Sequence, residues 1–424
     1  MNLRWPAAIA AALAARYASE SLRHRREGGR GYTLEDHPEV GSEGFLRAAE
    51  ALTQAPISRG NRAEVLINGD RIFPSMLGSI AAARRTVNLL SYIYWSGDIG
   101  RRVADAVCER AEAGVSCRVL LDAVGSVKMD PRLIERMEGS GARVCRFRPP
   151  KPYAIRRGNN RTHRKLLVVD GAVGFTGGVG IADEWTGDAQ DPGHWRDTHV
   201  RVEGPVVRGL QGAFAENWLE ATGEVLAGDD DLPALDPIPG ETAAMLSVRS
   251  SAGVGDTDVE TLFFLTIASA RRAIDLTSAY FAPRPAFLAA LADAARSGVA
   301  VRVLVPGEHI DKHVVRHAAR SVYGQLLEAG VRVFEYRPTM LHAKSLVVDG
   351  VWSTAGSANF DNRSFQLNDE IVLGVQDEAF AAALSEAFEH DLTRSDEVTE
   401  QEWRARPLSH RPREAAARLL RREL

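Results

Sequence analysis

Two stretches of the sequence carry a histidine and a lysine at the same spacing, each followed by an aspartate and a glycine. The first, THRKLLVVDG, spans residues 162–171, and the second, LHAKSLVVDG, spans 341–350. An imidazole can act as a nucleophile or as an acid–base group, and an ammonium can offset the negative charge of a phosphate. One His-x-Lys pair could arise by chance, but its repetition favours chemistry on an anionic group.

Each histidine stands two residues before its lysine, in the pairs His163–Lys165 and His342–Lys344. Successive side chains of a β-strand point to opposite faces, so residues two apart share a face. We therefore expect each imidazole to lie beside its ammonium at the mouth of an apolar strand. If the two copies pack around a pseudo-two-fold axis, both pairs can converge on one site.

The aspartate that closes each motif has a structural explanation of its own. Asp170-Gly171 and Asp349-Gly350 lie between apolar runs, and Asp-Gly is a favoured turn of a β-hairpin. We include Asp170 and Asp349 in the candidate catalytic set as members of the motif. Their expected contribution is mainly architectural, because they would fix the hairpin or hold the neighbouring side chains.

The motifs belong to a longer internal repeat. The segments 80–95, 111–121 and 139–149 are similar to 267–282, 295–305 and 327–338, in the same order. This indicates a duplicated domain rather than a short-period repeat. The acidic stretch EVLAGDDDLPALDPIPGE (224–241) between the copies has the composition of a linker.

Helix and strand patterns alternate within each copy and predict an α/β fold. In the first copy, Ile99, Val103 and Val107 fall on one helical face, Gly114 ends the helix, and the strand VSCRVLLD follows. The expected segments are an N-terminal extension (1–58), a first domain (59–223), a linker (224–244), a second domain (245–395) and a basic C-terminal helix (396–424).

The full pattern, His-x-Lys-x4-Asp-x6-Gly-Gly/Ser, resembles the phospholipase D superfamily, from about residue 60 to about 395. The positions that match it are His163, Lys165, Asp170, Gly177 and Gly178 in the first copy, and His342, Lys344, Asp349, Gly356, Ser357 and Asn359 in the second. The stretches RVEGPVV, FTGGVGIADEW and GSANFDNRSFQLNDE are similar to bacterial cardiolipin synthases. The resemblance implies two homologous mixed-sheet α-β-α domains related by a pseudo-two-fold axis, with one active site at their interface.

The resemblance also implies roles for the motif residues. One histidine, by resemblance His163, attacks phosphorus and forms a phosphohistidine, and His342 serves the leaving and incoming alcohols as acid and base. The sequence leaves that order open. Lys165 and Lys344 would offset phosphate charge, and the phosphate contacts would include Ser357, Asn359 and Gly178. Neither a metal nor another cofactor is implied.

Two carboxylates downstream of the motifs are candidates to orient the histidines. Asp197 in HWRDTHVRVEG and Glu370 in LNDEIVLGV match positions where the family carries the partner of the histidine, and ordinary polarity at a strand start is the alternative. The copies differ at Gly180, which stands where the second copy has Asn359, so we do not place Gly180 in the catalytic set.

The composition and charge of the chain limit the kinds of binding partner that we expect. The chain has 424 residues, 45% hydrophobic and 25% charged, with a net charge of −4, which argues against a general nucleic-acid coat. Basic residues nonetheless gather at 146–165 and 404–422, where they could contact phosphates or an anionic membrane. The expected partner is an anionic phospholipid, phosphatidylglycerol, at a membrane surface, with no obligatory protein partner and nucleic acid disfavoured.

The expected location is peripheral, at a bacterial inner membrane, or cytoplasmic. The apolar part of the N-terminal segment, residues 6–15, is about half of the ~20 residues that a membrane span requires. An interfacial helix is the favoured interpretation and a signal peptide the alternative. Three cysteines without Cys-x-x-Cys spacing predict neither a disulfide framework nor a zinc site.

Two further motifs give only weak indications of a binding site. The GGVG at 177–180 lacks the spacing of a dinucleotide loop. His309, His313 and His317 would share a face if their segment were helical, yet no carboxylate completes a metal site there. For the function as a whole, phosphatidyl transfer that forms cardiolipin is favoured; phospholipase D hydrolysis, a nuclease of the same superfamily and a non-enzymatic lipid- or DNA-binding module are the alternatives.

Overall fold

The computed structural model describes residues 33–150, 160–251 and 257–406. The described residues from 37 onward belong to one compact unit, which contains every element below. The expected N-terminal interfacial helix and the end of the basic C-terminal helix lie outside the described residues. No helix of the described part is both long and apolar enough to cross a membrane.

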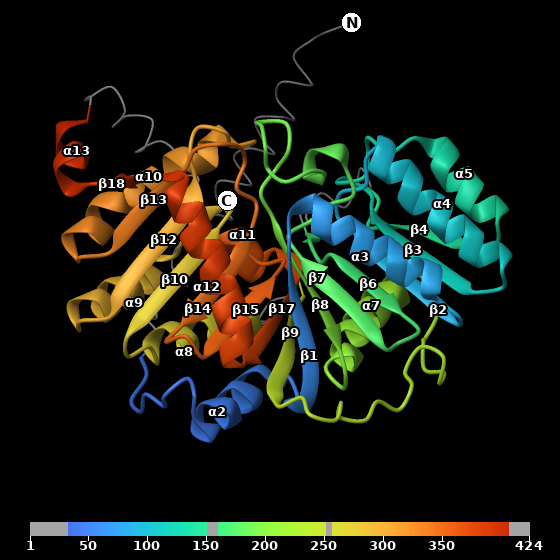
Figure 1. The fold of residues 1–424 in the computed structure, drawn as a ribbon, viewed down its shortest axis with the longest axis horizontal. Helices are drawn as coiled ribbons and strands as arrows, with labels where there is room; N and C mark the ends of the chain where they lie inside the picture. The colour runs from blue at the N-terminus through green and yellow to red at the C-terminus, as the bar shows by residue number, and fades with distance from the viewer. Residues whose placement is uncertain (1–32, 151–159, 252–256, 407–424) are drawn as a thin grey trace, which may run out of the picture. The chain divides into compact units, whose positions relative to one another are not determined.

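The first copy of the repeat folds into strands and helices in alternation (Figure 1). Its elements are β1 (Ser58–Ile67), α3 (Asn68–Ala82), β2 (Thr86–Ser91), α4 (Asp98–Glu112), β3 (Ser116–Asp122), α5 (Pro131–Gly139), β4 (Arg143–Phe147), β5 (Arg161–Thr162), β6 (Leu166–Val169), β7 (Val173–Gly177), η1 (Asp183–Trp185), β8 (Thr198–Glu203) and α7 (Val207–Thr222).

The second copy repeats this succession. Its elements are β9 (Ala243–Ser250), α8 (Asp258–Ala268), β10 (Ala273–Ser278), β11 (Phe281–Ala282), α9 (Pro285–Arg296), β12 (Ala300–Pro306), α10 (His313–Glu328), β13 (Arg332–Tyr336), β14 (Lys344–Val348), β15 (Trp352–Gly356), β16 (Phe360–Asp361), α11 (Asn362–Gln366), β17 (Asn368–Gln376), α12 (Glu378–Thr393), β18 (Ser395–Val398) and α13 (Glu400–Ala405). Helix α2 (Glu43–Thr53) precedes both copies.

One mixed sheet runs through both copies, and its strand order repeats. The first copy contributes β4-β3-β2-β6-β7-β8-β1, and the second continues with β9-β17-β15-β14-β10-β12-β13-β18. The junction is the antiparallel pair of β1 and β9, in which Ser58 pairs with Met245 and Asn61 with Ala243. The mixed α/β fold with two homologous halves that the sequence predicted is therefore confirmed; the proposed domain boundaries stay predictions.

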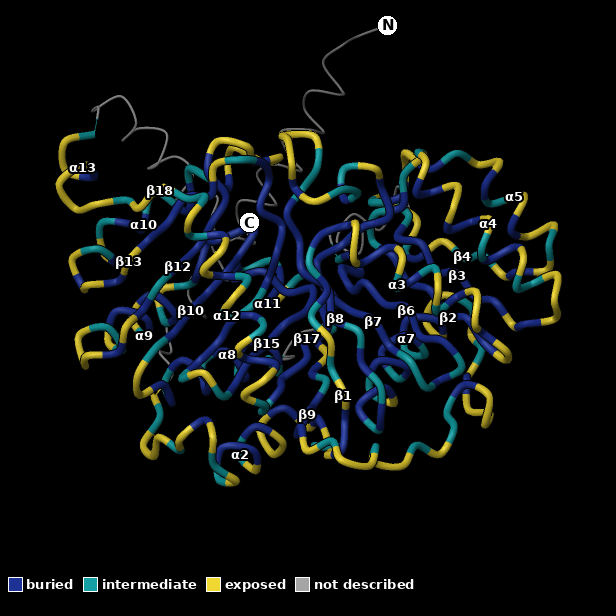
Figure 2. The backbone as a smooth tube through the Cα atoms, viewed as in Figure 1, coloured by how far each residue is buried: buried dark blue, intermediate teal, exposed yellow. Residues whose placement is uncertain are grey.

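Alternation along the strands explains why both faces of the sheet are buried. In β2, Val87 and Leu89 enter one core with α3 and α4, while Leu90 points to the opposite face and packs with α7. The second of these cores also takes in Met245 and Leu373, so the two halves share apolar packing. Figure 2 shows the buried strands lying between helices whose outer faces are exposed.

Both Asp-Gly turns form as predicted. Asp170 and Gly171 have φ angles of 53° and 62°, and the hairpin joins β6 to β7. Asp349 and Gly350, with φ angles of 55° and 70°, join β14 to β15 in the same way. Such left-handed conformations at both central positions are those of the hairpin turns that Asp-Gly favours.

The predicted location of the histidines and lysines within strands is wrong in part. His163, Arg164 and Lys165 precede β6, and His342 precedes β14, whose first residue is Lys344. The backbone before each strand is drawn toward the other half of the molecule instead, because β5 pairs with β17 and Leu341 forms a bridge with Arg196.

Three segments at the margins of the copies lie against the folded body. In the stretch assigned to the N-terminal extension, Phe45 of α2 packs edge-on against Trp352 at 4.7 Å between ring centroids. In the linker, the buried Asp231 accepts hydrogen bonds from Arg118 and Asn88 at 2.9 Å. In the C-terminal segment, β18 extends the sheet and α13 follows it.

Candidate active site

The strand pairing brings both histidines to the same edge of the sheet. Because β6 runs antiparallel to β2, with Leu166 opposite Leu90, His163 lies beyond the carboxyl end of β2. In the second half Lys344 lies opposite Ser278, the last residue of β10, so His342 occupies the equivalent position. The histidine end of each sequence motif thus lies at the carboxyl edge of a parallel strand pair, where α/β proteins commonly bind ligands.

Each histidine is held by the backbone of the other half. The N–H of His163 donates to the carbonyl of Asp369 at 2.8 Å, and the N–H of His342 donates to the carbonyl of Arg196 at 2.7 Å. These bonds explain why the motif leaves the strand before the histidine is reached. They also place each imidazole next to the residue that follows its backbone partner.

The residues that follow these backbone partners, Glu370 after Asp369 and Asp197 after Arg196, are the two carboxylates that the sequence singled out. Nδ1 of His163 lies 3.0 Å from Oε1 of Glu370, and Nδ1 of His342 lies 2.8 Å from Oδ2 of Asp197. Both contacts cross between the halves. An acceptor at Nδ1 holds the proton on that nitrogen and leaves the Nε2 lone pair for chemistry.

The two carboxylates have different neutral donors. Oδ2 of Asp197 also accepts from the indole N–H of Trp185 at 2.8 Å, whereas Glu370 accepts from the hydroxyl of Ser357. Gly178 stands where Ser357 does in the second half, and a Cβ atom there would come within 2.1 Å of the Asp197 carboxylate. Gly178 and Ser357 therefore contact the carboxylates, a placement that the sequence did not suggest.

Both motif lysines are buried among the other charges of the site. Nζ of Lys165 donates to the carbonyl of His163 at 2.8 Å, and Nζ of Lys344 lies 2.9 Å from Nδ1 of His342. Burial, together with the charge of Lys344, lowers the pKa of Lys165 to about 7. Burial lowers the pKa of Lys344 to about 8. An anion entering the site would favour the charged form of both.

The histidines are neutral at pH 7 for the same reasons. Burial and the charges of Lys165 and Lys344 hold the pKa of His163 well below its ordinary value. Burial and Lys344 lower the pKa of His342 to about 4. Lys344 of the second half thus acts on His163 of the first, and Lys165 of the first half acts on His342 of the second. Burial also raises the pKa of Glu370 to about 7.

Aromatic rings surround the two imidazoles. Tyr92 packs edge-on against His163 with 5.1 Å between centroids, and Trp185 packs against His342 at 5.2 Å. Tyr280 lies 6.2 Å from His342, and its backbone N–H donates to the amide oxygen of Asn359 at 3.3 Å. Tyr92 and Tyr280 therefore contact the site from one half each.

Arg164, between the motif histidine and lysine, links the halves beneath the site. Its guanidinium is fully buried and donates to the carbonyls of Glu370 at 3.1 Å and Ser250 at 2.8 Å, and to the side chain of Asn217 at 3.0 Å. The second motif has Ala343 at this position. Arg164 fixes the backbone of Glu370, and hence the carboxylate that faces His163.

The two motif aspartates are not brought into the site. Asp170 lies at the far end of β6, where its carboxylate accepts from the backbone N–H groups of Arg84, Arg85 and Thr86 at 2.7–3.2 Å. Asp349 does the same at the far end of β14, and its donors are the backbone N–H groups of Arg271, Arg272 and Ala273. Each aspartate ties its hairpin to the turn between a helix and the next strand.

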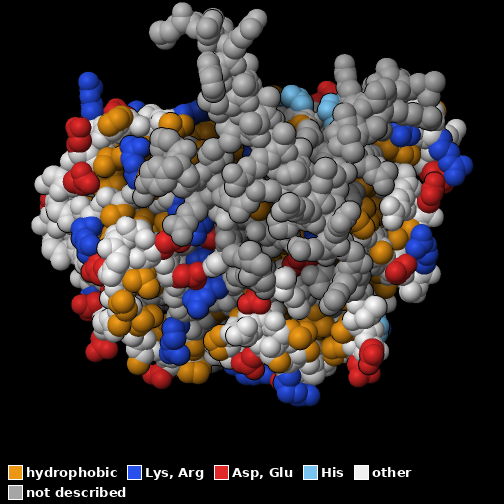
Figure 3. Space-filling model, turned by 180° about the vertical axis from the view of Figure 1, so that it is seen from behind, with side chains coloured by type: hydrophobic (Ala, Val, Ile, Leu, Met, Phe, Trp, Pro, Cys, Tyr) orange, Lys and Arg blue, Asp and Glu red, His pale blue; other side chains and the backbone are white. Residues whose placement is uncertain are grey.

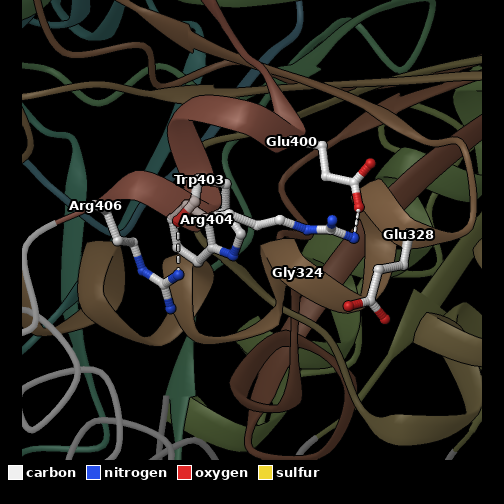
Figure 4. A pocket seen from close by; sticks show the side chains of 6 residues that line it. All are labelled: Gly324, Glu328, Glu400, Trp403, Arg404 and Arg406. Atoms are coloured by element: carbon white, nitrogen blue, oxygen red, sulfur yellow. Dashed lines mark hydrogen bonds and ion pairs between the residues drawn. The ribbon is translucent and has the colours of Figure 1, made fainter.

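No group of three or more His, Cys, Asp or Glu side chains in the described part of the chain is arranged to hold a metal ion. His309 precedes α10, so it does not share the helical face of His313 and His317. A cavity of about 250 Å³ between α10 and α13 is lined by Glu328, Glu400, Trp403 and neighbours (Figure 4). None of its lining residues belongs to the two motifs.

Trp185 and Trp195 are the site residues that the sequence alone missed. Trp195 lies 5.5 Å from the ring of His342 and 4.4 Å from that of Trp185. Trp185 closes FTGGVGIADEW, a stretch that resembles cardiolipin synthases, and Trp195 stands two residues before Asp197, but neither tryptophan was singled out as a site residue. Their role depends on how the halves meet.

A duplicated α/β fold with two His-x-Lys motifs at one sheet edge defines a phospholipase D-like protein. Residues 264–392 match the family model described as "Cardiolipin synthase, PLD-like domain". The structure is also similar to the crystal structure of phosphatidylserine synthase from Haemophilus influenzae, with a TM-score of 0.67 at 14% identity, over 90% of this chain and 100% of that one. That likeness concerns the fold.

Similarity to curated proteins is more specific. The chain is 37% identical to a cardiolipin synthase from Alkalihalophilus pseudofirmus over 381 residues, which covers 89% of this chain and 75% of the relative. It is also 37% identical to a cardiolipin synthase from Geobacillus kaustophilus, with the same coverage of each chain. The chain belongs to the cardiolipin synthase family.

Proposed function

We propose that this protein transfers a phosphatidyl group between two phosphatidylglycerol molecules, forming cardiolipin and releasing glycerol, at a membrane surface. The observation that carries the proposal is the single buried site in which His163 and His342 each meet a carboxylate of the opposite half. Family membership supports the same conclusion, because its relatives are cardiolipin synthases.

In the first step, Nε2 of His163 attacks phosphorus of the donor lipid. The bond between phosphorus and the oxygen of the glycerol headgroup breaks, and that oxygen takes a proton from His342, so glycerol leaves and a phosphatidyl-histidine remains. Glu370 supports the attack because it holds the proton of His163 on Nδ1. His342 must first gain a proton, which the incoming negative charge of the phosphodiester favours.

In the second step, His342 removes the proton from a glycerol hydroxyl of the second phosphatidylglycerol. The resulting oxygen attacks phosphorus, the bond to His163 breaks, and cardiolipin is released with His342 again protonated. Asp197 stabilises the imidazolium of His342 in both steps. This order of roles, with His163 as nucleophile, follows the resemblance of the first motif.

Lys165 and Lys344 supply the positive charge that the phosphodiester requires, and the burial of both ammoniums strengthens that interaction. Asn359 is a further candidate, because its amide oxygen is turned to Tyr280 and its NH2 group therefore points the other way. We assign Ser357 and Gly178 to the support of Glu370 and Asp197 rather than to the phosphate.

Hydrolysis would use the same site with water in place of the second lipid, and a nuclease would use it with a nucleic-acid backbone. Figure 3 shows basic and acidic side chains interspersed on the described part of one face. A nucleic acid would gain most of its affinity from contacts between its phosphates and basic side chains, and the net charge of −4 therefore favours the lipid substrate.

Product analysis tests the proposal. Purified protein is incubated with phosphatidylglycerol, phosphatidylethanolamine or DNA in separate reactions, and the products are identified by mass spectrometry. We expect cardiolipin and glycerol in equal amounts from phosphatidylglycerol, and none from His163→Ala or His342→Ala. Phosphatidic acid as the sole lipid product would indicate hydrolysis, and cleavage of DNA alone would overturn the lipid assignment.

A further inference from the structure

Two loops leave the sheet at the edge that carries the histidines. The first rim loop, residues 123–130, follows the carboxyl end of β3, and the second rim loop, residues 307–314, follows that of β12 and includes the start of α10. Because β3 runs parallel to β2 and β12 parallel to β10, both loops lie on the side of the sheet that holds His163 and His342.

Both rim loops expose apolar side chains. Among the described residues, six large hydrophobic side chains are markedly exposed, and three of them are Val124 (41%), Val127 (71%) and Val314 (37%) of these loops. Single exposed apolar residues are common on protein surfaces. Their concentration on two loops beside the site instead indicates a surface that is covered when the protein works.

A lysine accompanies the valines on each loop. Nζ of Lys128 lies 3.8 Å from the centre of the Trp95 ring, and Nζ of Lys312 lies 4.7 Å from that of Tyr280. The carboxylate of Asp311 accepts from the hydroxyl of Tyr280 at 2.7 Å. The loops therefore carry two ammoniums in contact with aromatic rings, beside the exposed acidic residues Glu308 and Asp311. Basic groups next to aromatic and apolar side chains suit an interface between water and lipid.

A chain of aromatic contacts joins the two loops across the site. Trp95, under Lys128, lies 6.4 Å from Trp185, and Trp185 lies 4.4 Å from Trp195. Trp195 packs against the ring of His342 and against the apolar cluster that contains Tyr280. The rim loops are thus linked through packed aromatic rings that border His342.

We propose that the two rim loops form a docking surface for a phospholipid bilayer that contains anionic lipid. Val124, Val127 and Val314 enter the acyl region, and Lys128 and Lys312 contact lipid phosphates. The inference rests on the proposed function, because the bilayer then delivers each phosphatidylglycerol headgroup directly to the edge of the sheet that holds the histidines. Mixed apolar and basic contacts are the usual basis of such peripheral binding.

Vesicle binding of the full chain tests the surface. Co-sedimentation is measured with phosphatidylcholine vesicles that contain or lack phosphatidylglycerol, for the wild type and for the double variant Val127→Ser/Val314→Ser. We expect roughly a tenfold loss of partitioning per valine. Val225→Ser is the matched control, since Val225 is 69% exposed outside both loops and should bind as the wild type does.

Single charge changes test the electrostatic part. Lys128→Gln should weaken binding to vesicles that contain phosphatidylglycerol, and Glu308→Gln should strengthen it, because Glu308 is exposed on the second rim loop. Both differences should shrink at high salt. Charge changes without effect on either vesicle type would exclude the proposed contact with anionic lipid.

Activity measurements separate docking from chemistry. The double valine variant should turn over dispersed short-chain phosphatidylglycerol as the wild type does, while its turnover of vesicles falls with its binding. If the wild type forms no cardiolipin, the proposed function fails, yet the binding assay still tests the rim loops. Equal vesicle binding by the wild type and the double variant would overturn the docking surface. The proposal would also fail if sedimentation velocity showed that the valine substitutions abolish self-association and change nothing else.

Discussion

His163 and Glu370 are separated by 207 positions in the chain, yet Nδ1 of the histidine lies 3.0 Å from Oε1 of the carboxylate. The contact of His342 with Asp197 crosses in the opposite direction. Each half therefore holds an imidazole that is oriented by the other half. Loss of either interface contact should impair the reaction even though both motifs stay intact.

Glu370→Gln removes the charge that faces His163 while preserving side-chain size. We expect kcat for phosphatidyl transfer to fall by roughly 10–100-fold or more, because the imidazole loses the acceptor that holds its tautomer. Glu203→Gln on β8 is the control, and wild-type kcat in Glu370→Gln would contradict the orienting role.

Trp185→Phe keeps an aromatic ring against His342 and removes the indole N–H that donates to Asp197. Asp197 then becomes a better acceptor for the imidazolium, so the pKa of His342 should rise from its present value of about 4. Because His342 must be protonated to release glycerol in the first step, we expect the alkaline limb of the pH profile of kcat/KM to move to higher pH. Trp195→Phe, which alters the other indole beside His342, should leave that limb in place.

Gly178→Ala introduces a Cβ atom that would lie 2.1 Å from Oδ1 of Asp197. The carboxylate must move away from His342, so kcat should fall by about 10–100-fold, while the thermal unfolding midpoint changes less. Gly78→Ala in α3, where a Cβ atom meets nothing within 4 Å, is the control and should retain full activity. Unchanged kcat in Gly178→Ala would show that the site tolerates displacement of Asp197.

Asp170→Asn and Asp349→Asn should affect stability rather than chemistry. Each carboxylate accepts from three consecutive backbone N–H groups, and an amide oxygen replaces those bonds only in part. We expect a loss of about 1–3 kcal/mol in the free energy of unfolding for each variant, with kcat per folded molecule retained. A large drop in kcat without destabilisation would instead place these aspartates in the catalytic machinery.

Lys165→Met should abolish transfer and raise thermal stability at neutral pH. The pKa of Lys165 is about 7 in the folded protein and about 10.4 in an unfolded chain. Between these values the unfolded state binds more protons, so wild-type stability should rise with pH over that interval. Unfolding midpoints measured across it should rise less steeply for Lys165→Met than for Lys128→Met, where the lysine is exposed.

The repeat made much of this arrangement predictable. Identical spacing in two copies indicated one site from two motifs, and the Asp-Gly pairs indicated the hairpins. The resemblance to the phospholipase D superfamily, rather than the repeat, identified Asp197 and Glu370 as candidate partners of the histidines. All of these features depend on local pattern, which survives in a single sequence.

The crossed pairing was not predictable in the same way. Which carboxylate meets which imidazole depends on β5 lying beside β17 and on the bridge between Arg196 and Leu341. The same contacts pull His163 and His342 out of their strands, against the alternation that placed them within. Trp185 was missed because its indole reaches Asp197 only after the first half has folded.

Strand β9 pairs with β1 on one edge and with β17 on the other, so backbone pairing continues from one half into the other across a register shift between Ser58 and Asn61. Hinge motion between the halves would break this ladder, and the separation of His163 and His342 is therefore set at folding. Under the proposed mechanism, one rigid geometry must accommodate the departing alcohol and then the arriving one. Such a site selects an acceptor shaped like its own leaving group, and the glycerol end of a second phosphatidylglycerol meets that requirement.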